Sequence, residues 1–167
     1  MLRAERLSAK HAVHGFVSTN ADLDSWLWNA ALTADRAGTA RVYVWADEDE
    51  RVAAYFAIAP HTIRRDDVPS TVGRGAPVTI PAFLLARLAL ARSMQGRGMG
   101  GELLVAALGT TLDAVRLGGG RVIVVDAIDA KARTFYEHYG FRAVEPVGGR
   151  LVMKASTAAA SLGVEWV

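Results

Sequence analysis

The strongest constraint on the fold is the stretch from Phe83 to Val125, which has the pattern strand, glycine-rich turn, helix, strand. Its first part, Phe83–Ala91, is a nearly continuous apolar run, as expected of a strand buried on both faces. After the glycine-dense Gly96–Gly101, one helical face is apolar, and Arg121–Val125 is a second buried strand. That face is formed by Leu104, Leu108, Thr111, Leu112 and Val115. Strands joined through a helix in this way predict a parallel crossover unit.

Upstream of this unit, the sequence predicts a strand at Arg3–Leu7 and a helix from about Asp22, with Asn20 or Asp22 as N-cap. On that helix Asp24 and Asn29 fall opposite the apolar face, so we expect both in solvent. Two further strands, separated by an acidic turn, read as an antiparallel hairpin. These strands are Arg41–Ala46 and Val52–Ala59.

The hairpin and the crossover unit are joined by a predicted polar loop of about 20 residues, which spans Pro60 to Pro81. Downstream, the pattern predicts a last helix at Ala130–Tyr139 and strands near Phe141–Val144 and Leu151–Lys154. With 167 residues and 51% hydrophobic side chains, the chain is long enough for one well-buried core. We therefore expect a single domain over residues 1–155 and a C-terminal tail over 156–167.

Composition excludes several classes of protein. The chain has no cysteine, which excludes a disulfide framework, a thiol nucleophile and a thiolate zinc site, and suits a reducing cytoplasm. It has no apolar run of about 18 residues, and Met1–Lys10 lacks an apolar signal-peptide core, so we expect no contact with a membrane. Because the spacing of its histidines matches no metal-ligand pattern, we expect no metal. The histidines are His11, His14, His61 and His138.

Charge is distributed unevenly along the chain. Residues 51–101 carry 7 basic and 2 acidic side chains, a net of +5, whereas the whole chain carries only +2. Of the 19 basic residues 16 are arginine, whose planar fork suits phosphate groups. The middle third is therefore a candidate surface for a polyanion, with an ordinary solvated surface as the alternative.

The glycine-rich turn has the properties of an anion site. Gln95–Gly101 (QGRGMGG) opens a helix, whose first backbone N–H groups are unpaired and lie at the positive end of the helix dipole. Glycines let that backbone approach an anion closely, which predicts a pyrophosphate site. Arg92 and Arg97 are near enough in sequence to add positive charge. A flexible turn without a ligand is the alternative.

The same turn also spells G-x-G-x-x-G with Gly96, Gly98 and Gly101, and Asp126 follows about 25 residues later, as in dinucleotide-binding proteins. Three features argue against that interpretation. The motif begins several residues after the strand, it lies more than halfway along a short chain, and only one crossover unit is visible.

Two motifs together point to a different family. The spacing Gln95-x-x-Gly98-x-Gly100 resembles the signature with which GNAT acetyltransferases hold the pyrophosphate of coenzyme A. Phe135-Tyr136-x-x-x-Gly140-Phe141 resembles the late motif of that family, and the order of the core elements agrees. The resemblance implies a mixed α/β (α+β) fold with a largely antiparallel sheet, a central parallel strand pair and flanking helices.

Shorter segments are similar to the GNAT toxins of bacterial toxin–antitoxin modules. They are Leu23-Asp24-x-Trp26-Leu27, Leu85-Ala86-Arg87-Leu88-Ala89, Val125-Asp126-Ala127 and Phe135-Tyr136. This resemblance implies acetylation of the α-amine of aminoacyl-tRNA, inhibition of translation, a ribbon-helix-helix type antitoxin as partner, and a homodimer. In place of the acidic residue expected soon after the strand, the chain has Ala91 and Arg92.

The resemblance also implies roles for single residues. Tyr136 would be the general acid for the thiolate of coenzyme A, and the backbone near Leu88–Leu90 would polarise the thioester carbonyl. The residues expected to bind acetyl-CoA are Leu88, Ala89, Leu90, Gln95, Gly96, Arg97, Gly98, Met99, Gly100, Gly101 and Phe135. The candidate tRNA contacts follow from charge instead, because phosphate contacts dominate such affinity; they are Arg64, Arg65, Arg74 and Arg87.

The acceptor amine is constrained by the absence of an obvious general base. An α-amine, with a pKa of about 7.7–8.0, is partly neutral at physiological pH, whereas a lysine amine, at about 10.4, must first lose a proton. This difference favours an α-amine as acceptor. Two alternatives remain open: an acetyltransferase of a small amine or a protein N-terminus, and a non-catalytic regulator that binds coenzyme A.

Overall fold

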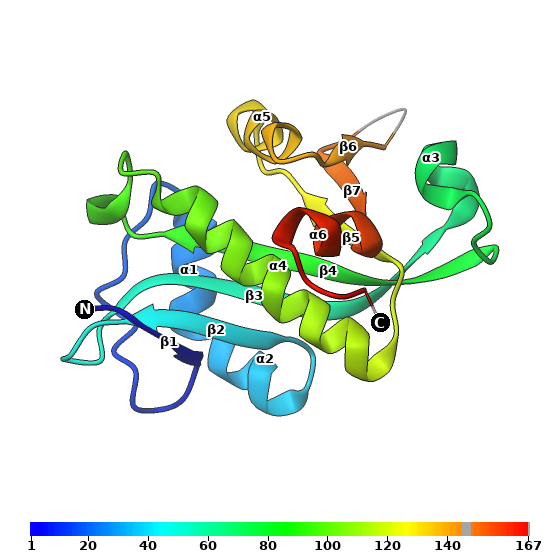
Figure 1. Ribbon diagram of the computed structural model, residues 1–167. Coiled ribbons are helices and arrows are strands. Elements are labelled where there is room, and N and C mark those ends of the chain that lie inside the picture. The colour runs from blue at the N-terminus through cyan, green and yellow to red at the C-terminus, as the bar shows by residue number, and fades with distance from the viewer. Residues whose placement is uncertain (145–147, 167) are drawn as a thin grey trace. The chain divides into compact units, whose positions relative to one another are not determined.

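The computed structural model describes residues 1–144 and 148–166 and contains a seven-stranded sheet of order β1-β2-β3-β4-β5-β7-β6 (Figure 1). The strands are β1 Arg3–Arg6, β2 Arg41–Ala46, β3 Val52–Arg64, β4 Thr79–Leu90, β5 Val122–Asp126, β6 Arg142–Ala143 and β7 Arg150–Lys154. The α-helices are α1 Ala21–Asn29, α2 Ala31–Ala37, α3 Ser70–Gly73, α4 Met99–Gly118, α5 Ala130–His138 and α6 Ala155–Leu162. Short 3₁₀ turns occur at η1 Arg65–Asp67 and η2 Arg92–Met94.

Strands β4 and β5 pair parallel, whereas β1–β2, β2–β3, β5–β7 and β6–β7 pair antiparallel. The predicted mixed sheet is confirmed.

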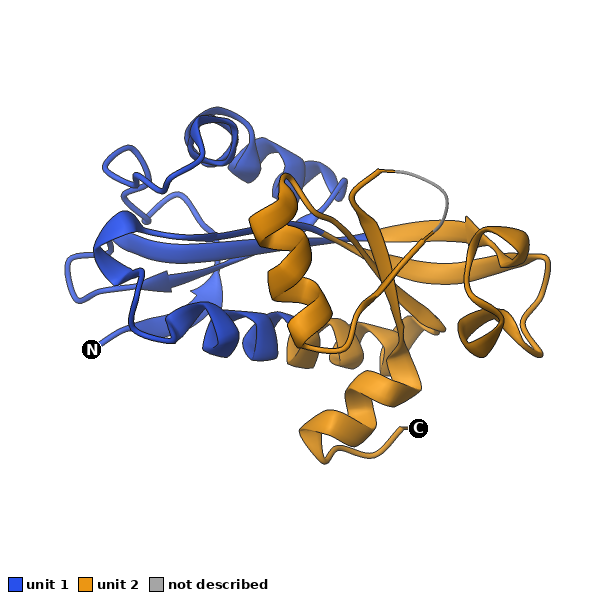
Figure 2. Ribbon diagram, turned by 90° about the horizontal axis from the view of Figure 1, so that it is seen from above, with its two compact units in different colours: residues 1–59, 86–107 blue, residues 60–85, 108–167 orange. Residues whose placement is uncertain are grey.

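The chain divides into two compact units, coloured separately in Figure 2. Unit 1 comprises Met1–Ala59 and Ala86–Ala107, and unit 2 comprises Pro60–Leu85 and Leu108–Val167. Strands β3 and β4 and helix α4 each contribute residues to both units. None of the helices in the described part of the chain combines the length and the apolar character needed to cross a membrane.

Unit 1 is built on the predicted hairpin. Strands β2 and β3 pair from Arg41↔Ile58 to Ala46↔Val52, with an irregularity at Trp45/Ala46. The side chain of Asn20 caps α1 by accepting a hydrogen bond from the Leu23 N–H at 2.9 Å, which confirms one of the two predicted caps. The buried apolar residues of α1, α2, β2, β3 and β4 form one core. This core includes Leu23, Leu27, Ala31, Val42, Val44, Tyr55, Ala57 and Ala89.

The predicted exposure of Asp24 is wrong. Its residue surface is only 5% exposed, and its carboxylate accepts hydrogen bonds from the Ser18 N–H at 2.9 Å and the Ser18 hydroxyl at 2.6 Å. A carboxylate with such partners can be buried, because its lost hydration is replaced. Periodicity alone does not show that the segment before the helix supplies these donors. Asn29 is exposed, as expected.

Unit 2 contains the parallel strand pair. Its register runs from Ala82↔Val122 to Leu85↔Val125, and residues 122–125 of β5 are all buried. Helix α4 ends at Gly118, where Gly119 adopts a positive φ of 84° and its N–H donates to the Val115 carbonyl. One buried core cluster of this unit is formed by Ile63, Val72, Ala76, Ile80, Ala82, Val122, Val124 and Val152.

The structure corrects the predicted long loop. Strand β3 continues past Pro60 to Arg64, and the chain then forms η1 and α3 before β4 begins at Thr79. Pro60 suggested a break because proline donates no hydrogen bond, yet a strand tolerates it where no donor is needed. The Arg65 N–H donates to the Val78 carbonyl at 2.9 Å, which ties the two ends of the segment together.

Strand β4 is not buried on both faces, as its apolar sequence had suggested. Ala86 is exposed, and Leu84, Leu88 and Leu90 are only half-buried. The expectation failed because an apolar run does not show which parts of its surface other elements cover. The partly open aliphatic surface is available to an apolar ligand.

The predicted C-terminal tail also needs correction, because residues 155–162 form helix α6. Ala155, Ala158 and Ala159 are buried, and Gly163 ends the helix with a positive φ of 68°. This helix lacks large apolar residues, so its periodicity is weak, although alanine is the strongest helix former. Val167 lies outside the described residues. Helix α5 is therefore not the last one, and the strand expected near Phe141–Val144 is limited to Arg142–Ala143.

Candidate active site

The glycine-rich turn lies in unit 1 and connects β4 to α4 through η2. Gly96 and Gly98 have φ values of 77° and 73°, in the left-handed region that strains any L side chain. A Cβ placed on either residue would meet no atom within 4 Å. Glycine is therefore needed here for its backbone conformation, and open space remains beside the turn for a ligand.

The turn is held by hydrogen bonds at its base. The Gln95 side-chain amide donates to the Leu90 carbonyl at 3.0 Å, and the Arg92 N–H donates to the Val17 carbonyl at 2.8 Å. Gln95 thus fixes the turn against the end of β4. Beyond the turn, Met99 begins a helix of 20 residues. The first backbone N–H groups of a helix have no acceptor within the helix. Arg97 is exposed beside them.

The last residues of β4 present two different surfaces. Because side chains alternate along a strand, Leu88 and Leu90 share one face and Arg87 and Ala89 the other. Ala89 is buried in the core of unit 1. The parallel register of β4 with β5 ends at Leu85, whereas strand β4 itself continues for five more residues to Leu90.

Tyr136 lies in unit 2, on α5, and is only 8% exposed. Its ring makes edge contacts with Phe135 and Phe141, with centroids 5.4 and 5.6 Å away. Burial raises the pKa of Tyr136 to about 12. Among the described residues, its hydroxyl has no hydrogen-bond partner, and it is not fully buried. The phenol is therefore neutral at physiological pH and free to donate to a ligand.

Phe135, also predicted to bind the cofactor, is half-buried and packs against Tyr139 with ring centroids 5.1 Å apart. Phe135 and Tyr139, four residues apart, thus lie on the same side of α5. Phe135 lies in unit 2 with Tyr136, whereas Leu88–Leu90 and the glycine turn lie in unit 1.

The four candidate tRNA contacts are divided between the two units. Arg64, Arg65 and Arg74 are exposed in unit 2, where Arg65 donates to the Ala76 carbonyl at 3.0 Å. Arg87 belongs to unit 1 and is half-buried, with its guanidinium carbon 4.8 Å from the centre of the Trp26 ring. Trp26 packs partly buried against the core, as expected for its helical position.

A charged group in unit 2 was not predicted. Arg150 donates to both carboxylate oxygens of Asp126, at 2.8 and 2.9 Å, and its Nη1 lies 3.3 Å from the His61 Nε2. The Arg150 contact lowers the pKa of Asp126, and burial together with Arg150 lowers the pKa of His61. Asp126 is thus neutralised by Arg150, which removes the ribose-binding role expected in a dinucleotide site. Residues far apart in sequence form this group, so spacing could not reveal it.

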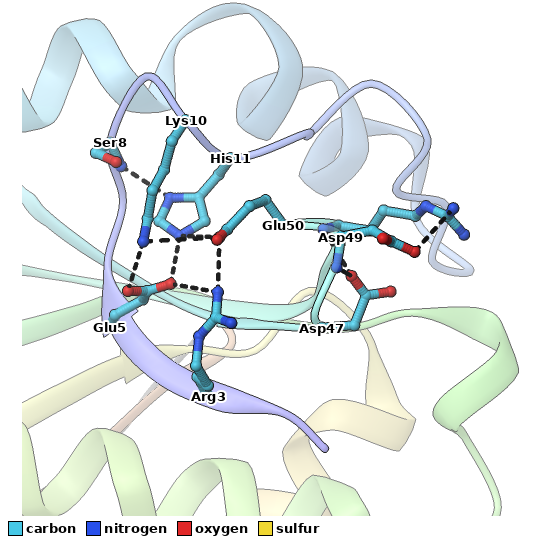
Figure 3. Close-up of polar contacts among 9 residues, drawn as sticks. Arg3, Glu5, Ser8, Lys10, His11, Asp47, Asp49 and Glu50 are labelled. Atoms are coloured by element: carbon cyan, nitrogen blue, oxygen red, sulfur yellow. Dashed lines mark hydrogen bonds and ion pairs between the residues drawn. The ribbon is translucent and has the colours of Figure 1, made fainter.

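Unit 1 also contains a cluster of Glu5, His11 and Glu50, whose ligand-type atoms lie within 4.8 Å of one another (Figure 3). Each group is already engaged. The Ser8 N–H donates to the His11 Nδ1 at 3.0 Å, and the His11 Nε2 lies 3.0 Å from Glu5.

Two cations complete this cluster. Arg3 contacts Glu50 at 2.8 Å, and Lys10 contacts Glu5 at 3.1 Å. The hydrogen bonds from His11 and Lys10 lower the pKa of Glu5 to about 2. Two carboxylates are therefore balanced by two cations, and a metal ion would have to displace both of them. The cluster is best explained as an ion-pair network that holds the first strand against the acidic turn.

Comparison with known proteins identifies the family. A model of the acetyltransferase (GNAT) domain matches residues 37–143. The chain is 36% identical over 155 residues to the tRNA-acetylating toxin of Mycobacterium tuberculosis, covering 92% of this chain and 93% of that protein.

Two solved structures share the fold. AtaT complexed with acetyl-methionyl-tRNAfMet has a TM-score of 0.88 at 24% identity, over 96% of this chain and 99% of that one. A mutant AtaT toxin bound to the C-terminus of the antitoxin AtaR and acetyl-CoA has a TM-score of 0.82 at 23% identity, over 98% and 99%. The family match over most of the sequence excludes the dinucleotide-binding alternative, and the chain belongs to the GNAT acetyltransferase family.

Proposed function

We propose that this protein transfers the acetyl group of acetyl-CoA to the α-amine of an aminoacyl-tRNA and thereby inhibits translation. The observation that carries the acceptor assignment is the 36% identity to a tRNA-acetylating toxin over 92% of the chain. We therefore also propose a cytoplasmic location, because charged tRNA is found in the cytoplasm.

The donor is acetyl-CoA, which GNAT domains use. Its pyrophosphate would be bound by the backbone N–H groups of the turn from Gln95 to Gly101 and the first turn of α4. The left-handed conformations of Gly96 and Gly98 and the open space beside them support this role. Gln95 would act by fixing the turn to the Leu90 carbonyl, while Arg97 adds positive charge. Phe135 would pack against an apolar part of the cofactor.

The acyl transfer itself needs no strong general base. The neutral α-amine attacks the thioester carbonyl carbon, and the N–H groups near Leu88–Leu90 would stabilise the negative charge that forms on its oxygen. The C–S bond then breaks, the amine nitrogen loses a proton, and the departing thiolate takes one up. An α-amine with a pKa of about 7.7–8.0 supplies the neutral form without a strong base.

Tyr136 would deliver the proton to the thiolate. Its raised pKa keeps the phenol protonated, and its hydroxyl, free of other partners among the described residues, can donate to an incoming sulfur. The buried contacts with Phe135 and Phe141 hold the ring in place.

Further parts of the proposal concern partners. Relatives are named as toxins, and one related toxin is bound to an antitoxin, so we propose a small ribbon-helix-helix antitoxin as the natural inhibitor. The assignments of a homodimer and of one acetyltransferase domain over residues 1–155 stay predictions. Arg64, Arg65 and Arg74 would contribute to tRNA affinity through phosphate contacts.

The test is an acceptor panel with labelled acetyl-CoA. The wild-type protein is incubated with a charged tRNA pool, the same pool after deacylation, small amines, and a peptide with a free N-terminus. We expect label only in the charged RNA. Label in a small amine or the peptide alone would support the alternative acetyltransferase. Binding of acetyl-CoA without transfer to any acceptor would support a regulator instead.

A further inference from the structure

Arg87 is part of a group of contacting side chains around Trp26 in unit 1. Its guanidinium lies over the Trp26 ring, 4.8 Å from the centroid, and Trp26 in turn stacks on Tyr55 at 6.1 Å and 16°. Tyr55 is fully buried and donates from its hydroxyl to the Leu23 carbonyl at 2.6 Å. Tyr55 is therefore fixed in the core, and Trp26 contacts both Tyr55 and Arg87.

The polar edge of Arg87 is unsatisfied. Three arginines are half-buried: Arg87, Arg133 and Arg150. Arg133 pairs with Glu137 and Arg150 with Asp126. Within residues 1–144 and 148–166, Arg87 makes neither a hydrogen bond nor an ion pair. A partly desolvated guanidinium without acceptors is costly unless a ligand supplies them.

The nearby acid does not compensate for this. Asp24 is close enough to influence Tyr55, as Arg87 is, but the Asp24 carboxylate is buried and occupied by Ser18. The guanidinium carbon lies over the Trp26 ring, and among the described residues the guanidinium N–H groups have no hydrogen-bond acceptor. Its planar fork can bind a phosphate through two N–H groups.

We propose that Arg87, held in place by Trp26, binds the phosphodiester that joins the last two nucleotides of the aminoacyl-tRNA. This inference rests on the proposed function. Arg87 precedes Leu88 directly, where the thioester carbonyl would be polarised, and its side chain lies on the opposite face of β4. An anion that Arg87 binds would therefore lie beside the strand segment at which the thioester carbonyl would be polarised.

The chemistry of the acceptor supports this choice of anion. In an aminoacyl-tRNA, the phosphate nearest to the α-amine is the one on the 5′ side of the terminal adenosine. The pyrophosphate of coenzyme A is assigned to the glycine turn, which begins at Gln95, beyond the end of β4. Arg87 would thus distinguish an aminoacyl-tRNA from a small amine, which carries no such phosphate.

The test uses the full-length protein and three acceptors that carry the same amino acid: the aminoacyl-tRNA, the aminoacyl ester of cytidylyl-adenosine, and the aminoacyl ester of adenosine. Arg87→Gln is expected to raise the KM for the first two by about tenfold or more, because a charge-assisted contact is lost. The KM for the adenosine ester and that for acetyl-CoA should change less than twofold. Arg87→Lys should give an intermediate rise, since lysine keeps the charge and loses the fork.

Three further variants keep the test decisive. Trp26→Leu should raise the KM for the phosphate-bearing acceptors by less than Arg87→Gln, whereas Trp26→Phe should stay closer to the wild type. Arg36→Gln removes an exposed charge elsewhere in unit 1 and serves as the matched control, and thermal melting shows that each variant is folded.

Equal losses on all three acceptors, a shifted KM for acetyl-CoA, or unchanged kinetics of Arg87→Gln would overturn the inference while the proposed function stands. If the wild type acetylates none of the three acceptors, the proposed function fails and this inference fails with it.

Discussion

Two buried tyrosines, one in each unit, have different environments. Tyr55 in unit 1 is fully buried, and its hydroxyl donates to the Leu23 carbonyl at 2.6 Å. Tyr136 in unit 2 is nearly as buried, at 8% exposure, but among the described residues its hydroxyl has no partner. Burial raises the pKa of both phenols.

The comparison shows that burial and a raised pKa do not by themselves identify a reactive group. Tyr55 uses its hydroxyl to satisfy a backbone carbonyl within a core, which is a structural role. The rings of Phe135 and Phe141 pack against the Tyr136 ring and hold it in place, while its oxygen remains available. The unpartnered hydroxyl, rather than the burial, is what supports the role of Tyr136 as an acid.

Replacing Tyr136 with phenylalanine should have the largest effect on catalysis. Because the hydroxyl would protonate the departing thiolate, turnover should fall at least about tenfold, while affinity for acetyl-CoA and the melting temperature stay close to the wild type. Steady-state release of coenzyme A and calorimetric titration with acetyl-CoA measure the two effects. Undiminished turnover would remove Tyr136 from the mechanism.

Replacing Tyr55 with phenylalanine should affect stability instead. The Leu23 carbonyl loses its side-chain donor, which should lower the free energy of unfolding by about 1–3 kcal/mol. Denaturant titration gives the change, and turnover of the folded fraction should remain above half of the wild-type value. A stable variant with a tenfold loss of turnover would reverse the roles assigned to the two tyrosines.

The smallest expected effect is the response of stability to alkaline pH. A phenol whose pKa is higher in the folded than in the unfolded state stabilises the fold below the unfolded pKa, near 10, and this contribution is lost as pH rises toward about 12. Tyr136→Phe and Tyr55→Phe should each make the decline of the unfolding free energy between these pH values less steep. Urea unfolding at several pH values measures the slope, and an unchanged slope in both variants would show that neither phenol has a raised pKa.

Local signals allowed much of the fold to be predicted from the sequence. The Asn20 cap, the hairpin and the parallel unit around the glycine turn depend on residues close together in the chain, where turn chemistry and periodicity act directly. The sequence pattern did not predict helix α6, because its alanines give little contrast between an apolar and a polar face. Asp24 was misplaced because its donors come from Ser18, outside the helix.

The candidate site was predictable only in part, for the same reason. The motifs identified the glycine turn and Tyr136, since each is a local pattern. The stack of Arg87 on Trp26 and the pairing of Arg150 with Asp126 join distant parts of the sequence, so only the folded chain shows them. A phosphate contact at Arg87 was expected from charge alone, whereas the structure adds the ring that orients it.

The central claim is that the acetyl group is placed on the α-amine of an aminoacyl-tRNA. Its most direct test is to identify the product: charged tRNA is reacted with acetyl-CoA and the wild-type protein, the ester bond is then cleaved, and the released amino acid is analysed by mass spectrometry. We expect an N-acetyl amino acid, formed in far smaller yield over the same time by Tyr136→Phe. An unmodified amino acid, with the acetyl group on the nucleic acid or on no acceptor at all, would contradict it.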